Sequence, residues 1–322
     1  MTDRIQKAAI TRNLQGRWMT FVVAVLLVSE PSLSAQEQPA DKPVAESEVA
    51  KRSREELQLS VAASAREFVG RCEFTAGEAG NSKLALYPEP ILRWSNPTAG
   101  SVFGEVFVWT DNGRPAVIAS WYRWFSPDWG RTLEVCSLAD SRMSGRLDDV
   151  RFWNTEKPGL TFKPLANADA SAKTPAARLV QMRRLAGDFV ANLADTRGND
   201  SGVKRQLRLL TQPVFRYPAP NGKADYSDGA MFAFVEGTDP EAFLLLEATK
   251  SNDNAKWRFG LVRMNSDALR VTFRDKEVWS VPKIENPLNL SKEPYALFTP
   301  AHIPLEPAAN DKKAAPATKA KP

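Results

Sequence analysis

The sequence predicts an α+β fold in which one unit, an N-terminal helix packed on a curved antiparallel sheet, occurs twice in tandem. Three observations predict it: two segments with apolar residues at helical spacing, short β-type runs after each of them, and Pro, Gly, Arg and aromatic positions that keep their order in both halves. Cystatin-like and nuclear transport factor 2-like folds share this order of elements, a likeness of fold that carries no function.

The two ends of the chain are predicted to lie outside the folded part. Residues 1–35 hold four basic residues, an apolar run of 11 residues at Trp18–Val28 and small residues at Ser32–Ala35, an order typical of a secretory signal peptide. The run is shorter than the roughly 20 residues that span a bilayer, although an uncleaved anchor is the alternative. Residues 36–52 are predicted to be a flexible leader and residues 304–322, rich in Ala, Pro and Lys, a disordered tail. The sequence therefore predicts an exported protein, periplasmic or secreted, with no membrane span in its mature chain.

The first repeat, residues 53–157, is predicted to open with a helix. Ser53 and Glu56 form the Ser-x-x-Glu pattern of a capping box. The apolar residues that share one face of this helix are Leu57, Val61, Ala65, Phe68 and Cys72.

The second repeat, residues 174–282, is predicted to open in the same way. Thr174 is the expected N-cap, and Pro175 occupies the first helical position, where its missing N–H is not needed. The matching apolar stripe consists of Leu179, Met182, Ala186, Phe189 and Leu193.

Matched residues in the two repeats predict the same turns and the same core. Residues 158–173 are predicted to be the linker between the repeats, and residues 283–303 an extended segment after them. The matches are Pro90–Trp94 with Pro213–Tyr217, Gly104 with Gly229, Pro115 with Pro240, and Trp153 with Trp279.

Both cysteines are predicted to occupy core positions, since Cys72 aligns with Leu193 and Cys136 with Val262. Export favours disulfides, so a Cys72–Cys136 bridge is one possibility. Two buried thiols that never meet are the other.

The composition argues against most catalytic schemes. The single histidine, His302, lies outside both repeats, and no phosphate-binding loop, dinucleotide fingerprint or nucleophile elbow is present. We therefore expect no metal and no cofactor. A net charge of +5 is too small to indicate a nucleic-acid partner. Carboxylates without a diagnostic spacing, Glu134 and Asp239 among them, are the remaining route to catalysis, so an enzyme is disfavoured but not excluded.

Arg93 and Arg216 are a matched charged pair, each beside an aromatic residue, Trp94 or Tyr217. If a pseudo-twofold axis relates the repeats, both guanidinium groups could face one cleft and bind an anion. The alternative is that each arginine pairs with a carboxylate or turn carbonyls in its own half.

The segment Trp121–Trp129 breaks the repeat with a dense group of aromatic residues. Strand alternation predicts Trp121 and Arg123 on one face and Tyr122 and Trp124 on the other, with Trp129 in a following loop. Trp121, Tyr122, Trp124 and Trp129 are therefore candidates for stacking on a sugar or for a protein interface. The alternative is that they pack inside the protein, between the halves.

At Pro90–Pro97, Gly100–Thr110 and Glu236–Glu241 the chain resembles a family of exported bacterial proteins with no assigned activity. The resemblance runs from about Leu84 to Pro282. It implies export, and it transfers no functional residue.

These observations favour an exported, non-catalytic binding or interaction protein. Its site is expected at the junction of the repeats or on residues 121–129, and its partner is an envelope glycan, a protein or a small anion. A carboxylate-dependent hydrolase acting on an envelope polymer is the alternative.

Overall fold

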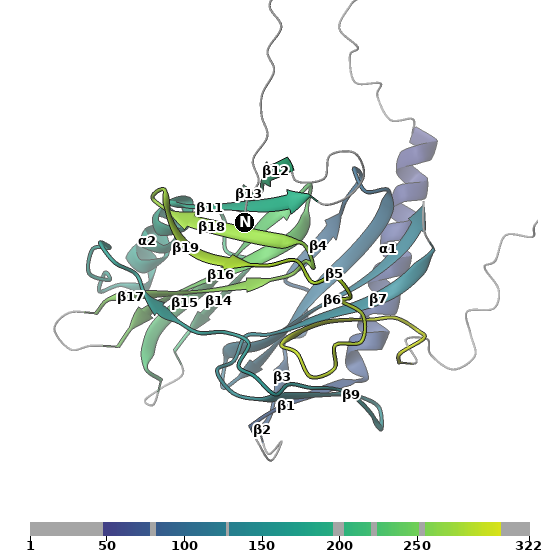
Figure 1. Ribbon diagram of the computed structural model, residues 1–322, viewed down its shortest axis with the longest axis horizontal. Coiled ribbons are helices and arrows are strands. Elements are labelled where there is room, and N and C mark those ends of the chain that lie inside the picture. Colours follow the sequence, from purple (N-terminus) through teal and green to yellow (C-terminus); the bar gives the residue numbers. More distant parts are fainter. Residues whose placement is uncertain are drawn as a thin grey trace, which may run out of the picture. The chain divides into compact units, whose positions relative to one another are not determined.

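Antiparallel β structure dominates the protein. The computed structural model describes residues 48–77, 82–126, 129–195, 203–219, 224–250 and 255–303, which form two helices and four antiparallel sheets (Figure 1). Neither helix in these ranges is long and apolar enough to cross a membrane. The predicted signal peptide, most of the predicted leader and the predicted tail lie outside the described residues.

The first half contains helix α1, a four-stranded sheet and a six-stranded sheet. α1 spans Glu48–Gly70. The small sheet has the order β2 (Ser82–Lys83), β1 (Cys72–Ala76), β8 (Met143–Leu147) and β9 (Val150–Asn154). The large sheet has the order β20 (Tyr295–Phe298), β7 (Gly130–Ser137), β6 (Arg114–Ser126), β5 (Ser101–Asp111) and β3 (Ala85–Leu86), and β4 (Leu92–Ser95) also pairs with β5.

The second half has the same kinds of element in the same order. α2 spans Pro175–Gly187. The small sheet has the order β12 (Val203–Gln206), β11 (Phe189–Asp195), β18 (Ala268–Phe273) and β19 (Lys276–Val281). The large sheet has the order β10 (Lys163–Pro164), β17 (Trp257–Arg263), β16 (Asp239–Thr249), β15 (Tyr226–Glu236) and β13 (Arg208–Leu209), and β14 (Phe215–Pro218) pairs with β15.

The outer edge of each large sheet is covered by a strand from outside the predicted repeats. β10 belongs to the predicted linker and pairs with β17, whereas β20 belongs to the segment after the second repeat and pairs with β7. The four ladder pairs of β20 join Tyr295–Phe298 to Leu133–Cys136. The predicted linker and extended segment therefore each contribute a strand to a sheet.

The start of α2 was predicted correctly. Thr174 is its N-cap, and the Thr174 side chain accepts a hydrogen bond from the N–H of Ala177 at 3.3 Å. The predicted cap of α1 was wrong, because the helix begins at Glu48 and Ser53 lies inside it. Residues 48–52 are Glu, Val, Ala, Lys and Arg, mostly good helix formers that allow the helix to extend upstream.

The ends of both predicted helical stripes were also wrong. Cys72 begins β1, and Phe189 and Leu193 belong to β11. A strand also explains the second stripe, because Phe189, Ala191 and Leu193 are buried at alternate positions.

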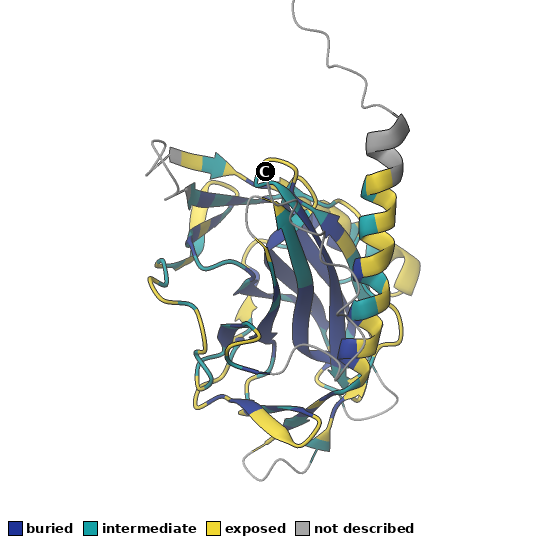
Figure 2. Cartoon of the chain, turned by 90° about the vertical axis from the view of Figure 1, so that its right-hand side faces the viewer, coloured by how far each residue is buried: buried dark blue, intermediate teal, exposed yellow. Residues whose placement is uncertain are grey.

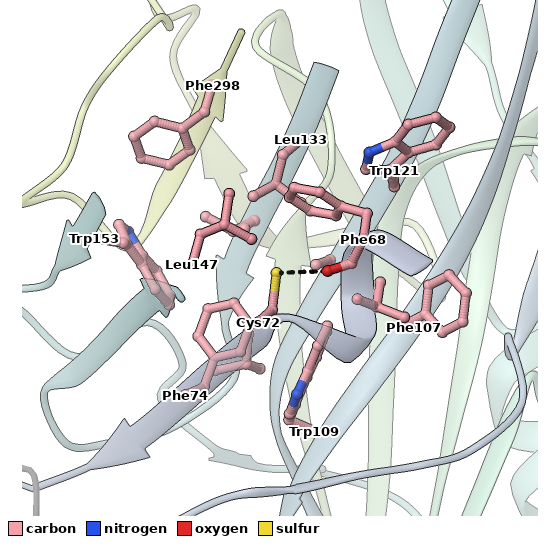
Figure 3. Packing of buried hydrophobic residues seen from close by; sticks show 14 of the residues in the cluster. Phe68, Cys72, Phe74, Phe107, Trp109, Trp121, Leu133, Leu147, Trp153 and Phe298 are labelled. Carbon is pink, nitrogen blue, oxygen red and sulfur yellow. Dashed lines mark hydrogen bonds between the residues drawn. The ribbon is translucent and has the colours of Figure 1, made fainter. Parts of the chain in front are cut away.

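Three hydrophobic clusters occupy the two faces of the large sheets. In the first half, one sheet face packs against α1 and the small sheet, with Phe68, Phe74, Trp109, Trp121 and Trp153 at its centre (Figure 3). The inward side of α1 is buried and its outward side exposed (Figure 2). An equivalent cluster lies beneath α2 in the second half.

The third cluster joins the two halves. It combines Trp94, Val106 and Ile118 from the first large sheet with Tyr217 and Phe243 from the second. The remaining faces of the two large sheets therefore pack against each other, and we call this region the junction.

A close contact between an aromatic ring and a glycine recurs in both halves. A Cβ atom on Gly104 would lie 2.4 Å from the Trp94 ring, and one on Gly229 would lie 2.3 Å from the Tyr217 ring. Each glycine is the ladder partner of that aromatic residue. Only glycine lets these rings lie flat on the neighbouring strand.

The register of the small sheets corrects one part of the alignment. Cys72 is opposite Leu147, next to the Arg71–Asp148 ion pair, and Phe189 is opposite Phe273, next to the Asp188–Arg274 ion pair. Cys72 therefore corresponds to Phe189, not to Leu193. The two ion pairs occupy the same place with their charges exchanged.

The cysteines are free thiols in different clusters. Cys72 contacts the carbonyl oxygen of Phe68 at 3.6 Å in the cluster beneath α1 (Figure 3). Cys136 lies on the opposite face of the large sheet, in the junction. The bridge considered from the sequence is absent because a sheet separates the two sulfur atoms.

Candidate functional site

Arg93 and Arg216 do not share a cleft. The Arg93 Nε donates to Glu105 Oε1 at 2.7 Å, and Arg216 Nη2 donates to Asp228 Oδ2 at 2.7 Å. Arg216 also donates to the carbonyl oxygen of Pro175 at the start of α2. Since the neighbouring Trp94 and Tyr217 face the junction, strand alternation directs both arginines away from it. The prediction of one anion site between them was wrong, and each pairs within its own half.

Trp121 and Trp129 lie far from any shared site. Trp121 is 1 % exposed, and its ring centre lies 6.2 Å from that of Phe68, so it belongs to the core beneath α1. Its prediction as a ligand residue was wrong for that reason. Trp129 is exposed and makes an edge contact with Phe125, while Arg123 stacks on both rings. Between them, residues 127–128 lie outside the described part of the chain.

Tyr122 and Trp124 instead line a cavity of about 140 Å³ in the junction, which we call the junction pocket. β6 supplies these two residues, β7 supplies Glu134, and β20 supplies Tyr295. β16, from the other large sheet, supplies Asp239 and Glu241. The alternation predicted for β6 is correct, because Trp121 faces α1 while Tyr122 and Trp124 face the junction.

Glu134 is an acid of this pocket with a raised pKa. The residue is 8 % exposed, and its carboxyl group accepts a hydrogen bond from the Tyr295 hydroxyl at 2.6 Å. Burial raises the pKa of Glu134 to about 8, and the nearby charge of Glu241 contributes to the increase. Glu134 is therefore mostly protonated at neutral pH.

The other two acids of the junction pocket are held by amide side chains. Glu241 is 3 % exposed and accepts a hydrogen bond from Asn265 Nδ2. Asp239 accepts one from Asn96 Nδ2 at 3.3 Å. Among the described residues that line this pocket there is no lysine or arginine, so an anionic ligand would find no cationic partner in the lining.

A second corner of the junction occupies the equivalent place and contains an ion-pair network. Arg114 corresponds to Asp239, since each precedes the matched proline, and Glu247 corresponds to Tyr122, since each is opposite the matched glycine. Arg114 Nε and Nη2 donate to the two oxygens of Glu247, both at 2.9 Å. Glu247 has no solvent exposure and also accepts from the Arg258 Nε at 2.7 Å. One corner thus contains an ion-pair network with a cavity of about 110 Å³ beside Arg114, and the other contains the junction pocket.

Sequence reasoning had included Glu134 and Asp239 among the available carboxylates without a diagnostic spacing, and it had missed Glu241. Their convergence depends on the packing of two sheets, which no local pattern encodes. Within the described ranges, no group of His, Cys, Asp and Glu residues is arranged to hold a metal ion.

Comparison with known proteins gave no match to a family model, to a curated protein or to a solved structure.

Proposed function

We propose that the chain is an exported, non-catalytic binding protein and that the junction pocket is its ligand site. The observation that carries this proposal is the convergence of Glu134, Asp239 and Glu241 on a cavity lined by Tyr122 and Trp124. A buried acid with a raised pKa that lines a cavity, as Glu134 does, is typical of functional sites. At the equivalent corner the acid is paired with two arginines, whereas the described lining of the junction pocket contains no lysine or arginine.

The proposal includes a tandem duplication of one α+β unit. Support for it comes from the shared strand order, from the Trp94–Gly104 and Tyr217–Gly229 contacts, and from the exchanged ion pairs beside β1 and β11. The export part of the proposal rests on residues 1–35 and on the resemblance to exported bacterial proteins. In such a duplication one junction corner was free to acquire a ligand.

We propose a ligand that carries a small protonated amino group. Ionised carboxylates only accept hydrogen bonds, and the faces of Tyr122 and Trp124 attract cations. The 140 Å³ cavity is smaller than a typical drug-sized site, so it fits one small group of a larger ligand. An amino sugar of an envelope glycan offers such a group, and it replaces the small anion as the favoured ligand.

Calorimetric titration with glucosamine and with glucose tests this assignment. We expect heat of binding for glucosamine and a much weaker signal for glucose, which lacks the charge. Glu241→Gln should abolish the preference, whereas Glu285→Gln, which changes an exposed acid outside the pocket, should keep it. Equal binding of the two sugars, or a preference that survives Glu241→Gln, would contradict the proposal.

One observation favours hydrolysis as a second candidate function. A protonated Glu134 beside Glu241 resembles the acid and base pair of glycoside hydrolases, in which the environment separates the pKa values of two carboxyl groups. Release of reducing ends from purified peptidoglycan by the wild-type protein, and its loss in Glu134→Gln, would establish this activity. No release by the wild-type protein would leave binding as the function.

A further inference from the structure

A larger pocket shares Tyr295 with the junction pocket as a lining residue. Its volume is about 370 Å³, within the range of small-molecule sites. It lies between the β7 and β20 edge of the first large sheet and strands β17 and β19 of the second half. We call it the apolar pocket, because half of its lining residues are large and hydrophobic: Leu261, Val262, Trp279, Val281, Ile284 and Leu290.

Arg263 is the one cationic residue in this lining among the described residues. Its Nη2 donates to the carbonyl oxygens of Asp267 and Pro282 at 2.7 and 2.8 Å, and its guanidinium lies 5.5 Å from the centre of the Tyr295 ring. The Arg263 Nε is buried and has no hydrogen-bond partner in the described structure. A buried donor without an acceptor is unfavourable, and a small shift of Arg263 toward a ligand oxygen in the pocket would remove that cost.

Two acids near Arg263, Glu134 and Glu293, leave its positive charge available to a ligand. Burial lowers the pKa of Arg263, while the charges of Asp267 and Glu134 act in the opposite direction through space. Glu134 is mostly neutral at pH 7 because its pKa is about 8. Glu293 also lines the pocket, but Lys157 Nζ lies 3.0 Å from its carboxylate and neutralises it.

We propose that the apolar pocket binds a small amphipathic carboxylate, with its acid group on Arg263 and its hydrocarbon body against Leu261, Trp279 and Val281. A carboxylate supplies the acceptor that the Nε lacks and the negative charge that a guanidinium favours. The apolar walls gain from covering a hydrocarbon chain. This site is additional to the junction pocket and does not depend on the proposed function.

Decanoate and decanol are the probes that test it, because they share a hydrocarbon chain and differ in charge. Binding is followed by calorimetry and by the change in tryptophan fluorescence expected when a ligand contacts Trp279. The ligands are used at concentrations below those at which micelles form. In the wild-type protein we expect decanoate to bind at least tenfold more tightly than decanol. Asp239→Asn, which changes another acid of the junction pocket, should leave this ratio unchanged, and this separates the test from that of the junction pocket.

Arg263→Met removes the charge while keeping a side chain of similar length, so the tenfold ratio should fall to about one. Arg263→Lys should retain a preference for decanoate. Val281→Trp leaves Arg263 in place and fills the pocket, so it should weaken the binding of both decanoate and decanol. If circular dichroism shows that Arg263→Met is unfolded, Val281→Trp serves as the test in its place. Absence of decanoate binding, equal affinities in the wild-type protein, or a ratio that survives Arg263→Met would overturn the proposal.

Discussion

Replacing Glu134 by glutamine is expected to remove a pH dependence from the stability of the protein. The unfolded chain releases the Glu134 proton near its ordinary pKa of 4.5, whereas burial in the junction pocket raises the folded-state pKa to about 8. Between these values the folded protein holds one proton more than the unfolded chain. Its free energy of unfolding therefore falls as pH rises, by at most about 1.4 kcal/mol per pH unit.

The contribution of Glu134 is fully present below about pH 4.5 and is lost as pH rises through about 8. At neutral pH the loss relative to acidic solution is on the order of 3 kcal/mol, a large part of the stability of an ordinary domain. Glutamine cannot ionise and still offers an oxygen to the Tyr295 hydroxyl. We therefore expect Glu134→Gln to be more stable than the wild-type protein at about pH 8, with a difference that shrinks toward about pH 5.

Urea unfolding followed by tryptophan fluorescence at several pH values between these limits measures the effect. The free energy of unfolding should depend on urea concentration with the same slope in all variants, so that differences between transition midpoints report differences in stability. Glu285→Gln is the matched control, because the Glu285 side chain is 74 % exposed and should follow the wild-type curve. A constant difference between Glu134→Gln and the wild-type protein across the pH range would refute the reasoning.

Two further predictions test packing. Gly229→Ala should destabilise the protein by about 1–3 kcal/mol, because the new Cβ would lie 2.3 Å from the Tyr217 ring. Gly130→Ala is the control and should have little effect, because a Cβ there would have no neighbour within 4 Å. Equal melting temperatures for the two variants would contradict this account. Burial raises the pKa of the Cys72 thiol and raises that of Cys136 to about 12, so both should resist iodoacetamide in the native protein and both should react after denaturation without reductant. A denatured protein that takes up no label by mass spectrometry would instead indicate a disulfide.

The sequence was informative where local chemistry determines the structure. Thr174 and Pro175 specify a helix start through one hydrogen bond and one fixed backbone angle, and α2 begins there. Ser53 shows the limit of such a signal, because a capping pattern does not stop good helix formers upstream from joining the helix. Phe189 was misassigned because its spacing from Ala186 suits a helix while its alternation with Ala191 suits a strand, and Gly187 ends the helix between them.

The candidate site was less predictable because it forms between distant segments. Strand alternation correctly placed Tyr122 and Trp124 on one face, but no local pattern shows that Glu134 and Glu241 meet across two sheets. The repeated arginine was misleading for a related reason. Arg216 recurs with Arg93 because each neutralises an acid of the adjacent strand, a structural role that a duplication would also preserve.

The strand β20 affects the order in which the protein can acquire its structure. Until Tyr295–Phe298 has been synthesised, the backbone N–H and C=O groups along the free side of β7 have no ladder partner. During synthesis, the first half would then expose an unpaired sheet edge that can pair with strands of other chains. We therefore expect the N-terminal half to need protection from such pairing, or to remain incompletely folded, until nearly the whole polypeptide is present. An isolated fragment of this half should self-associate.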